Sequence, residues 1–367
     1  MTRDTRVPVV DFLRGLSCLG VLLYHVRVEL WVGWWEITNK ANEYSAFTRL
    51  VAWLSIPTPF LGYAILLFFL ISGFCIHYPN SNSNSIYPCW KTYFIRRFWR
   101  IYPPYMAALL FTVGISFICF KLWGDNDWNP ERILRVATLT QNYPPSNGQF
   151  LSNPSLWTIP LEVEFYILYP IAFYFFKTSK VRNLWIISLG LTAVSIVLEM
   201  KGLSWITFTA FFLWPSWLLG AWVAQNFQSP KIENLKVHNQ ILCMLFSLAL
   251  ALASRYLNWT TWTQYVSWTI FYLSFFIFCL SNTNLLILFI GKEIFKVTSW
   301  IGKISFSLYL IHFPLFKLFG YLHLEIFRSK PANFLITLLY IVPVILIAFL
   351  FFKFVEKPIH QWSRNRT

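Results

Sequence analysis

Three ionisable side chains, Asp11, Arg14 and His25, lie within the first long apolar run of this 367-residue chain. Ionisable groups are costly inside an apolar helix, and where they occur they usually face a protein interior and mark function. On a helix the three fall on one arc of about 60°, with Arg14 and His25 about 16 Å apart along the axis. The pattern predicts a polar stripe with a cation at one end and an imidazole at the other. The alternative is an Asp11–Arg14 pair at the edge of the run plus a hydrogen-bonded core histidine.

Two later apolar runs add a carboxylate and a hydroxyl to this set. Glu162 opens the fourth run, at the depth expected for His25. A carboxylate beside an imidazole orients the ring and favours its protonated form, as acid–base catalysis requires. Glu164 points in another direction, so we expect it to be the poorer partner. Ser72 precedes Gly73 in the second run, where it contacts a ligand or bonds back to its own helix, while Gly73 favours close helix packing.

A pair of arginines, Arg97 and Arg100, precedes the third run at a spacing that puts both on one face if the segment is helical. Together with Arg14, these guanidinium groups would suit a phosphate-bearing ligand. The alternative is that these arginines anchor the cytoplasmic end of the span or bind anionic lipid. In the ninth run, Tyr309 and His312 share a face with Ser305. We expect this face either to line a pocket or to make a polar contact between helices.

The composition determines which elements position these residues. The chain is 57% hydrophobic and 12% charged, with a mean hydropathy of +0.53. Soluble domains carry about twice that charged fraction, so a soluble fold is excluded. Apolar runs of roughly 18 residues predict membrane-spanning helices. We therefore expect an all-α polytopic membrane protein with ten spans, at 8–31, 59–78, 102–122, 162–176, 184–199, 206–225, 239–256, 265–281, 304–319 and 334–353.

The basic charge indicates topology. With the N-terminus inside, the inner segments, which include Arg3, Arg6 and Lys231, hold about twice as many Lys and Arg as the outer ones. Both termini are therefore predicted to be cytoplasmic, and the net charge of +15 needs no nucleic-acid partner. The stretch 282–303 is expected to be an interfacial helix or part of an overlong eighth span. Glu356-Lys357-Pro358 is expected to end the last span.

The cysteines and histidines show no metal-ligand spacing, so we expect no metal. We interpret residues 1–367 as a single transmembrane domain without an appended soluble domain.

Six short motifs occur in order along the chain. They are Asp11-x-x-Arg14 followed by His25, Phe68-Phe69-x-x-Ser72-Gly73-Phe74, Arg97-x-x-Arg100-Ile101-x-Pro103, Trp157-x-x-x-x-Glu162-x-x-Phe165-Tyr166, Ser305-x-x-x-Tyr309-Leu310-x-His312 and Glu356-x-Pro358. Together they resemble the acyltransferase-3 family of integral-membrane acyltransferases, many of which O-acetylate bacterial surface polysaccharides. One departure is Pro160, two residues before Glu162, where family members usually carry a small polar residue.

The resemblance implies a ten-helix core in which His25 is the essential catalytic residue. It also implies that Arg14, Arg97 and Arg100 serve a cytoplasmic acyl-CoA donor. We therefore predict an O-acyltransferase of the bacterial inner membrane that moves an acyl group, expected to be acetyl, from acetyl-CoA to a hydroxyl group of a glycan. The glycan would be a lipid-linked or cell-surface polysaccharide or lipopolysaccharide on the extracytoplasmic side.

In this hypothesis His25 is the general base, Glu162 orients it, and Ser72 joins the arginines at the donor. Acetyl-CoA is a substrate, no cofactor stays bound, and membrane lipids surround the protein. The alternative function is a polytopic transporter or flippase for a glycan lipid or acyl group, in which the polar stripe is a permeation path.

Overall fold

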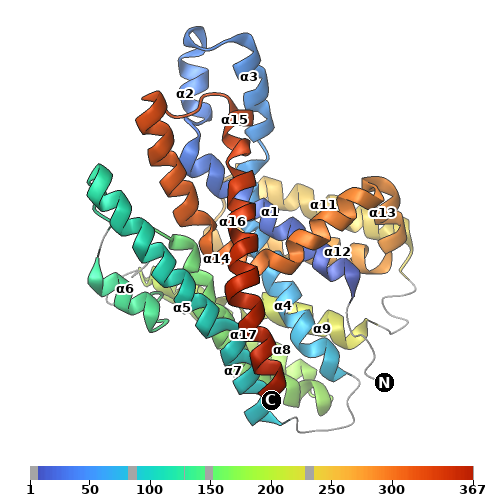
Figure 1. Ribbon diagram of the computed structural model, residues 1–367. Coiled ribbons are helices and arrows are strands. Elements are labelled where there is room, and N and C mark those ends of the chain that lie inside the picture. Colours follow the sequence, from blue (N-terminus) through green and yellow to red (C-terminus); the bar gives the residue numbers. More distant parts are fainter. Residues whose placement is uncertain (1–6, 82–88, 128, 145–151, 228–234, 367) are drawn as a thin grey trace. The chain divides into compact units, whose positions relative to one another are not determined.

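The computed structural model describes residues 7–81, 89–127, 129–144, 152–227 and 235–366. Within these ranges the regular elements are all helices (Figure 1). Ten helical segments there are long and apolar enough to cross a membrane, which confirms the predicted fold class and number of spans. The cytoplasmic location of the termini stays a prediction, and Arg3, Arg6 and Lys231 lie outside the described residues.

The spans follow one another in chain order. Their helices are α1 (Pro8–Leu30), α4 (Ala64–Ser81), α5 (Trp90–Trp123), α7 (Thr158–Lys177), α8 (Val181–Met200), α9 (Ala210–Asn226), α11 (Val237–Tyr256), α12 (Thr261–Ser281), α14 (Lys292–Phe327), and, in the last span, α15 (Phe334–Leu339), α16 (Ile341–Phe351), the π-helical η6 (Phe352–Glu356) and α17 (Lys357–Arg366). The shorter helices are α2 (Trp34–Asn39), η1 (Ala41–Glu43), α3 (Ala46–Ala52), η2 (Trp53–Ser55), η3 (Thr58–Tyr63), α6 (Pro130–Ala137), η4 (Pro154–Trp157), η5 (Ser204–Phe208) and α13 (Thr283–Ile290).

Two boundaries differ from the sequence prediction. The stretch 282–303 is not an extension of the eighth span, because α12 ends at Ser281 and the stretch divides at Gly291 into α13 and the first turns of α14. The interfacial position of this stretch stays a prediction. Gly291 has a φ of 85°, a left-handed value that ends α13 and that glycine adopts without strain.

The predicted stop at Glu356-Lys357-Pro358 is wrong, because the helix continues to Arg366. Pro358 has no N–H group and would clash with the preceding turn of a regular helix. The chain adopts a π-helical turn over Phe352–Glu356, which places Pro358 in the first turn of α17, where its missing donor is tolerated. The last helical segment therefore reaches further along the chain than its apolar residues indicate.

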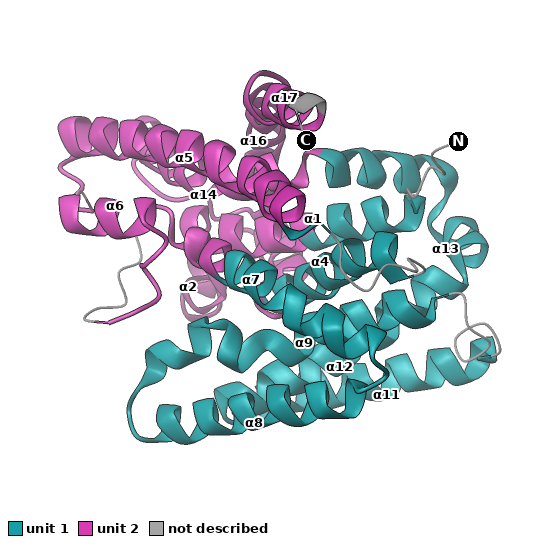
Figure 2. Cartoon of the chain, turned by 90° about the horizontal axis from the view of Figure 1, so that it is seen from below, with its two compact units in different colours: residues 1–17, 63–90, 161–303 teal, residues 18–62, 91–160, 304–367 magenta. Residues whose placement is uncertain are grey.

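The chain divides into two compact units built from interleaved segments (Figure 2). Unit 1 contains Met1–Ser17, Tyr63–Trp90 and Leu161–Lys303, and unit 2 contains Cys18–Gly62, Lys91–Pro160 and Ile304–Thr367. Helices α1, α5, α7 and α14 each contribute to both units. The interpretation of the chain as one domain with nothing appended stays a prediction.

In unit 1, α4 and α9 pack with their backbones in contact. A Cβ atom on Gly73 would lie 2.0 Å from the carbonyl oxygen of Trp217, and one on Gly220 would lie 1.8 Å from that of Leu70. No side chain fits at either position, so close packing is confirmed as the role of Gly73. Small residues at such crossings allow spanning helices to gain van der Waals contact in the absence of a hydrophobic driving force.

Helices α1 and α14 pack on each other and run in the same direction. In unit 1, a Cβ atom on Gly15 would lie 1.9 Å from the carbonyl oxygen of Thr298, so the two backbones touch there. In unit 2, the Cys18 thiol lies 3.7 Å from the carbonyl oxygen of Ser305. Residue numbers rise together along both helices, as expected for the first and ninth of ten alternating spans. In unit 2 this pairing brings Cys18 and His25 of α1 next to the face of α14 that carries Ser305 and His312.

Proline residues inside the spans leave carbonyl groups that the helix cannot satisfy. Pro314 lies inside α14, and because it has no N–H group, the carbonyl four residues earlier, at Leu310, lacks its usual donor. The side-chain amide of Asn153 donates to that carbonyl over 2.8 Å, and it also contacts the hydroxyl of Thr112 at 3.2 Å. The segment before η4 is thereby fastened to the middle of α14.

The same arrangement recurs at two other prolines. Pro104 frees the carbonyl of Arg100 in α5, and the imidazole Nε2 of His360 lies 3.4 Å from it. Pro215 frees the carbonyl of Phe211 in α9, where the Thr192 hydroxyl lies 3.4 Å away. In each case a side chain from another helix supplies the donor that proline removes, as the bilayer interior requires.

A double-mutant cycle tests this account of Asn153. In the wild type, Asn153→Leu leaves the Leu310 carbonyl buried without its donor, so we expect the free energy of unfolding to fall by about 1–3 kcal/mol. In a Pro314→Ala background the new N–H group bonds the Leu310 carbonyl. The same substitution should then lower the free energy of unfolding by at least about 0.5 kcal/mol less than in the wild type. Thermal or denaturant unfolding in detergent measures both, and an equal loss in the two backgrounds would contradict the pairing.

Candidate active site

Unit 2 brings together two histidines from helices far apart in the sequence. The Nδ1 atom of His25, on α1, lies 2.8 Å from the Nε2 atom of His312, on α14. His312 is fully buried and His25 is partly exposed. The Tyr24 and Phe313 rings meet His25 edge-on, with centroids 5.1 Å and 5.2 Å from that of the imidazole. His25 is therefore held by one nitrogen and by aromatic contacts at its sides.

The backbone of α14 determines which nitrogens of this pair carry protons. The Nδ1 atom of His312 lies 2.8 Å from the carbonyl oxygen of Tyr309 and 3.2 Å from that of Leu308. Carbonyl oxygens only accept hydrogen bonds, so His312 Nδ1 is protonated and the Nε2 of the neutral ring is an acceptor. His25 must then donate from Nδ1, which leaves its Nε2 with a free lone pair. That nitrogen is the one available to accept a proton from a substrate.

The polar face predicted for α14 is a set of helix contacts. The Tyr309 hydroxyl donates to the carbonyl of Ser155 over 2.7 Å and accepts from Thr158 over 2.8 Å, which holds the turns at the start of α7. Its neighbour His312 faces His25. Sequence reasoning placed His312 on the correct face and left its role open between a pocket and a helix contact. It assigned the orienting role to Glu162, because that carboxylate was expected at the depth of His25, whereas His312 lies 287 residues away in the sequence and no local pattern joins the two.

Unit 1 brings together Ser72 and Glu162, two other predicted site residues. The Ser72 hydroxyl lies 3.4 Å from Oε1 of Glu162, and the indole N–H of Trp217 lies 3.3 Å from that hydroxyl. The Tyr166 hydroxyl donates to the same carboxylate oxygen. Glu162 thus accepts from α4 and from its own helix. His25 belongs to unit 2, so an orienting role of Glu162 toward it stays a prediction.

The neighbours of Glu162 have structural roles. Pro160 is the third residue of α7, in the first turn, where its missing N–H group would have no helical partner anyway. The family departure at this position is therefore compatible with a regular helix start. Glu164 accepts the backbone N–H of Ala210 over 2.7 Å and so caps the beginning of α9. This contact agrees with the prediction that Glu164 points away from Glu162.

The three arginines predicted to bind phosphate lie on two helices. Arg97 and Arg100 are in the first turns of α5, so the segment is helical and the two residues share a face. The guanidinium of Arg97 lies over the Tyr93 ring, 5.6 Å from its centroid. Arg14 is in the unit 1 part of α1, next to the close packing at Gly15. A joint site of Arg14 with the α5 pair stays a prediction.

A buried ion cluster lies beyond His312 on α14, and sequence reasoning missed it. Lys317, five residues along the helix, lies 2.6 Å from Asp125 Oδ2 and also pairs with Asp127, on the segment after α5. The Lys317 side chain is only 11% exposed, so its charge needs these partners. A third contact, at 3.5 Å, joins it to the Ser152 hydroxyl. The cluster fixes the segment that precedes Asn153 and η4.

The described residues of this site form no apparent metal centre. Among the residues that the structure describes, no three His, Cys, Asp or Glu side chains gather as ligands of one ion. In the His25–His312 pair, His25 Nδ1 and His312 Nε2 bond each other and His312 Nδ1 bonds the backbone.

Comparison with known proteins identifies a family. The pattern of a family described as Acyltransferase domain (Acyl_transf_3) matches residues 7–353. Acyltransferase MdmB of Streptomyces mycarofaciens is 25% identical over 199 residues, which are 53% of this chain and 46% of that protein. Peptidoglycan O-acetyltransferase OatA of Listeria monocytogenes is 24% identical over 412 aligned positions, which cover 98% of this chain and 58% of that protein.

The chain spans about half the length of these curated relatives. No solved structure matches it. The matched region contains both histidines of the pair and most of both units, whereas α17, which belongs to unit 2, follows it in the chain.

The tautomer of His25 is directly testable. We expect ¹⁵N NMR of histidine-labelled protein to show His25 with a protonated Nδ1 and a bare Nε2, assigned by the signals lost in His25→Ala. In His312→Phe the acceptor is gone, and the ring should shift toward the Nε2–H form. The matched control is His238, on α11, whose signals should be unchanged in that variant. A wild-type His25 that carries its proton on Nε2 would contradict the arrangement.

Proposed function

Because this chain belongs to the acyltransferase family that matches residues 7–353, we propose that it is a membrane-bound O-acyltransferase that transfers an acetyl group from acetyl-CoA to a hydroxyl group of a glycan. The observation that carries the proposal is the His25–His312 pair, which leaves one imidazole nitrogen as a free acceptor. General-base catalysis of acyl transfer needs such a nitrogen within reach of the attacking hydroxyl.

The reaction then proceeds by direct transfer. His25 Nε2 removes the proton from the acceptor hydroxyl as its oxygen attacks the thioester carbonyl. The carbon–sulfur bond breaks, the acetyl group moves to the oxygen, and the leaving thiolate takes the proton back from His25. His312 accepts from His25 Nδ1 throughout, and this contact stabilises the positive charge that His25 carries in the transition state.

In this proposal, cationic side chains form the binding site for acetyl-CoA, the acyl donor. Coenzyme A carries several phosphate groups, and guanidinium groups bind phosphate with two hydrogen bonds each. Arg97 and Arg100 would bind these phosphates from one face of α5, and Arg14 would join them from α1. Ser72 and Glu162 are hydrogen-bonded to each other in unit 1. In this proposal Ser72 would contact the arm of acetyl-CoA that carries the thioester, and Glu162 would orient His25.

The acceptor proposal is supported by the name of one relative, a peptidoglycan O-acetyltransferase. A glycan outside the cytoplasm offers many hydroxyl groups, and the predicted topology places His25 in the outer half of α1. We therefore propose a cell-surface or lipid-linked glycan as acceptor and the bacterial inner membrane as location. A transporter or flippase would move a glycan lipid or acyl group without any transfer chemistry.

Loss of the base should abolish transfer. We expect His25→Ala to lower the rate of labelled acetyl transfer from acetyl-CoA to membrane glycan at least about 100-fold, because general-base catalysis is lost. His312→Phe, which keeps the base and removes its acceptor, should lose a smaller factor of roughly 10 or more. The assay uses membranes of cells that contain equal amounts of each variant.

Two results would overturn the proposal. One is full activity of correctly inserted His25→Ala, and the other is the absence of any acetyl transfer by the wild type, as a transporter would show. His77 is a suitable control, because it is a buried histidine of unit 1 that hydrogen-bonds with Gln225 at 2.7 Å. His77→Gln should keep the wild-type acetylation rate when the protein is inserted normally.

The donor site predicts a different kinetic signature. Arg97→Gln and Arg100→Gln should each raise the KM for acetyl-CoA roughly tenfold or more, because a charge-assisted hydrogen bond is lost. Their kcat should change little, since the phosphates lie far from the reacting bond. Lys91→Gln, which removes one exposed cation from the same end of α5, is the matched control. An unchanged KM in both arginine variants would contradict the donor assignment.

A further inference from the structure

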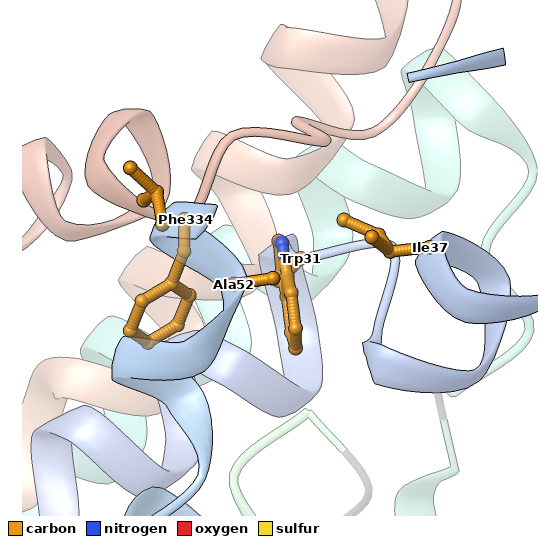
Figure 3. Close-up of a cluster of buried hydrophobic side chains, with 5 residues drawn as sticks. Trp31, Ile37, Ala52 and Phe334 are labelled. Carbon is orange, nitrogen blue, oxygen red and sulfur yellow. The ribbon is translucent and has the colours of Figure 1, made fainter. Parts of the chain in front are cut away.

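The segment between the first two spans has two apolar sides. Its inner side packs into unit 2, where Ile37 of α2 and Ala52 of α3 join Trp31 and Phe334 in a buried cluster (Figure 3). The Trp31 indole donates to the Ala332 carbonyl over 2.8 Å, which ties the end of α1 to the start of the last span. This packing fixes which side of α2 and α3 faces outward.

The outward side is also apolar. Leu50 is 67% exposed and Trp53 is 61% exposed, close to the 62% of Leu242 on the spanning helix α11. We call this set the apolar outer face; its members are Trp35, Phe47, Leu50, Trp53, Leu54 and Ile56. Transfer of such a side chain out of water is worth roughly 1.5–3 kcal/mol when it is complete. Six of them on short helices would be an unusual surface to leave in water.

Exposed polar residues are concentrated at the tip of the segment, and Arg49 on α3 is an exposed cation outside it. Between α2 and α3 the exposed residues are polar or charged, and Lys40 pairs there with Glu36 at 2.8 Å. The polar tip consists of Thr38, Asn39, Lys40, Asn42, Glu43 and Ser45. Exposed polarity therefore changes along the segment, from a tip suited to water to a face suited to hydrocarbon. A surface that binds only water-soluble partners would not require this division.

The composition of the apolar outer face selects among possible occupants. Tryptophan residues are typical of the layer between headgroups and hydrocarbon, and Arg49, which lies between Phe47 and Leu50, can reach anionic headgroups. A sugar-binding platform needs aromatic rings flanked by hydrogen-bonding groups, whereas Leu50, Leu54 and Ile56 are aliphatic. The face is also continuous with a span, because the apolar run Ala46–Ser81 includes both α3 and α4.

We propose that residues 34–56 form an interfacial membrane anchor, in which the apolar outer face lies among lipid acyl chains and headgroups and residues 38–45 lie in water. The anchor fixes the end of α1 that carries His25, since Trp31 packs directly beneath it. His25 is five residues before Leu30, about 8 Å along the helix. The base is thereby held just below the membrane surface, where the head of a lipid-linked or surface acceptor can reach it.

Photo-crosslinking in vesicles tests the proposal. The photoreactive amino acid p-benzoylphenylalanine replaces Leu50 or Trp53 in the full chain, reconstituted in phosphatidylethanolamine–phosphatidylglycerol vesicles. Leu242, exposed on α11, is the matched lipid-facing control, and Asn42 in the polar tip is the matched water-facing control. We expect phospholipid adducts at positions 50 and 53 at yields within about twofold of position 242 and at least about tenfold above position 42.

The other outcomes overturn the proposal. An adduct to a second copy of the chain would identify an interface between copies, and an adduct to added cell-wall glycan would identify an acceptor surface. Yields at positions 50 and 53 equal to that at position 42 would place the face in water. Because the readout is an adduct mass, it does not depend on acetylation activity and is independent of the proposed function.

Discussion

The fold depends on the rule that backbone polar groups in a bilayer must find partners within the protein. Regular helices meet this rule by themselves, but prolines inside spans do not. Here three prolines each free a carbonyl that a side chain from elsewhere in the chain approaches: Asn153 at Leu310, His360 at Arg100 and Thr192 at Phe211. At these three prolines, the contacts hold together segments that are distant in sequence.

The backbone also determines the chemistry of the histidine pair, because a carbonyl oxygen only accepts hydrogen bonds. The carbonyl groups of α14 near Pro314 accept from Nδ1 of His312, and the Asn153 amide accounts for the Leu310 carbonyl next to them. With the proton of His312 fixed on that nitrogen, its other nitrogen accepts from His25. The direction of each proton therefore follows from the backbone of one helix, and no ionised partner is needed to orient the base.

Much of this architecture is predictable from the sequence. Membrane-spanning helices are recognised by their length and hydropathy, and the few polar groups inside them stand out. The spans, the stripe with His25, the shared face of Arg97 and Arg100, and the packing role of Gly73 all follow from local periodicity. Contacts between distant segments do not. The pairing of His25 with His312 depends on the register of α1 and α14, and the ion cluster at Lys317 depends on where the segment after α5 meets α14. No local pattern encodes either contact.

Other misses have local physical reasons. Hydropathy averages over a window, so it hides a helix that continues past its apolar residues, as α17 does beyond the π-helical turn at Phe352–Glu356. Gly291, with a positive φ, separates two helices within the stretch 282–303, and a single glycine leaves no mark on hydropathy. The segment between the first two spans looks like a loop because its helices, α2 and α3, are only 6 and 7 residues long.

Chemical rescue tests the central claim, that His25 supplies the base through one free nitrogen, most directly. Substitution His25→Gly leaves a space beside His312 that free imidazole can occupy. The measurement is the initial rate of labelled acetyl transfer from acetyl-CoA in reconstituted vesicles as the imidazole concentration rises. The account predicts a saturable recovery in His25→Gly and none in the wild type. Transfer by His25→Gly at the wild-type rate without imidazole would contradict it.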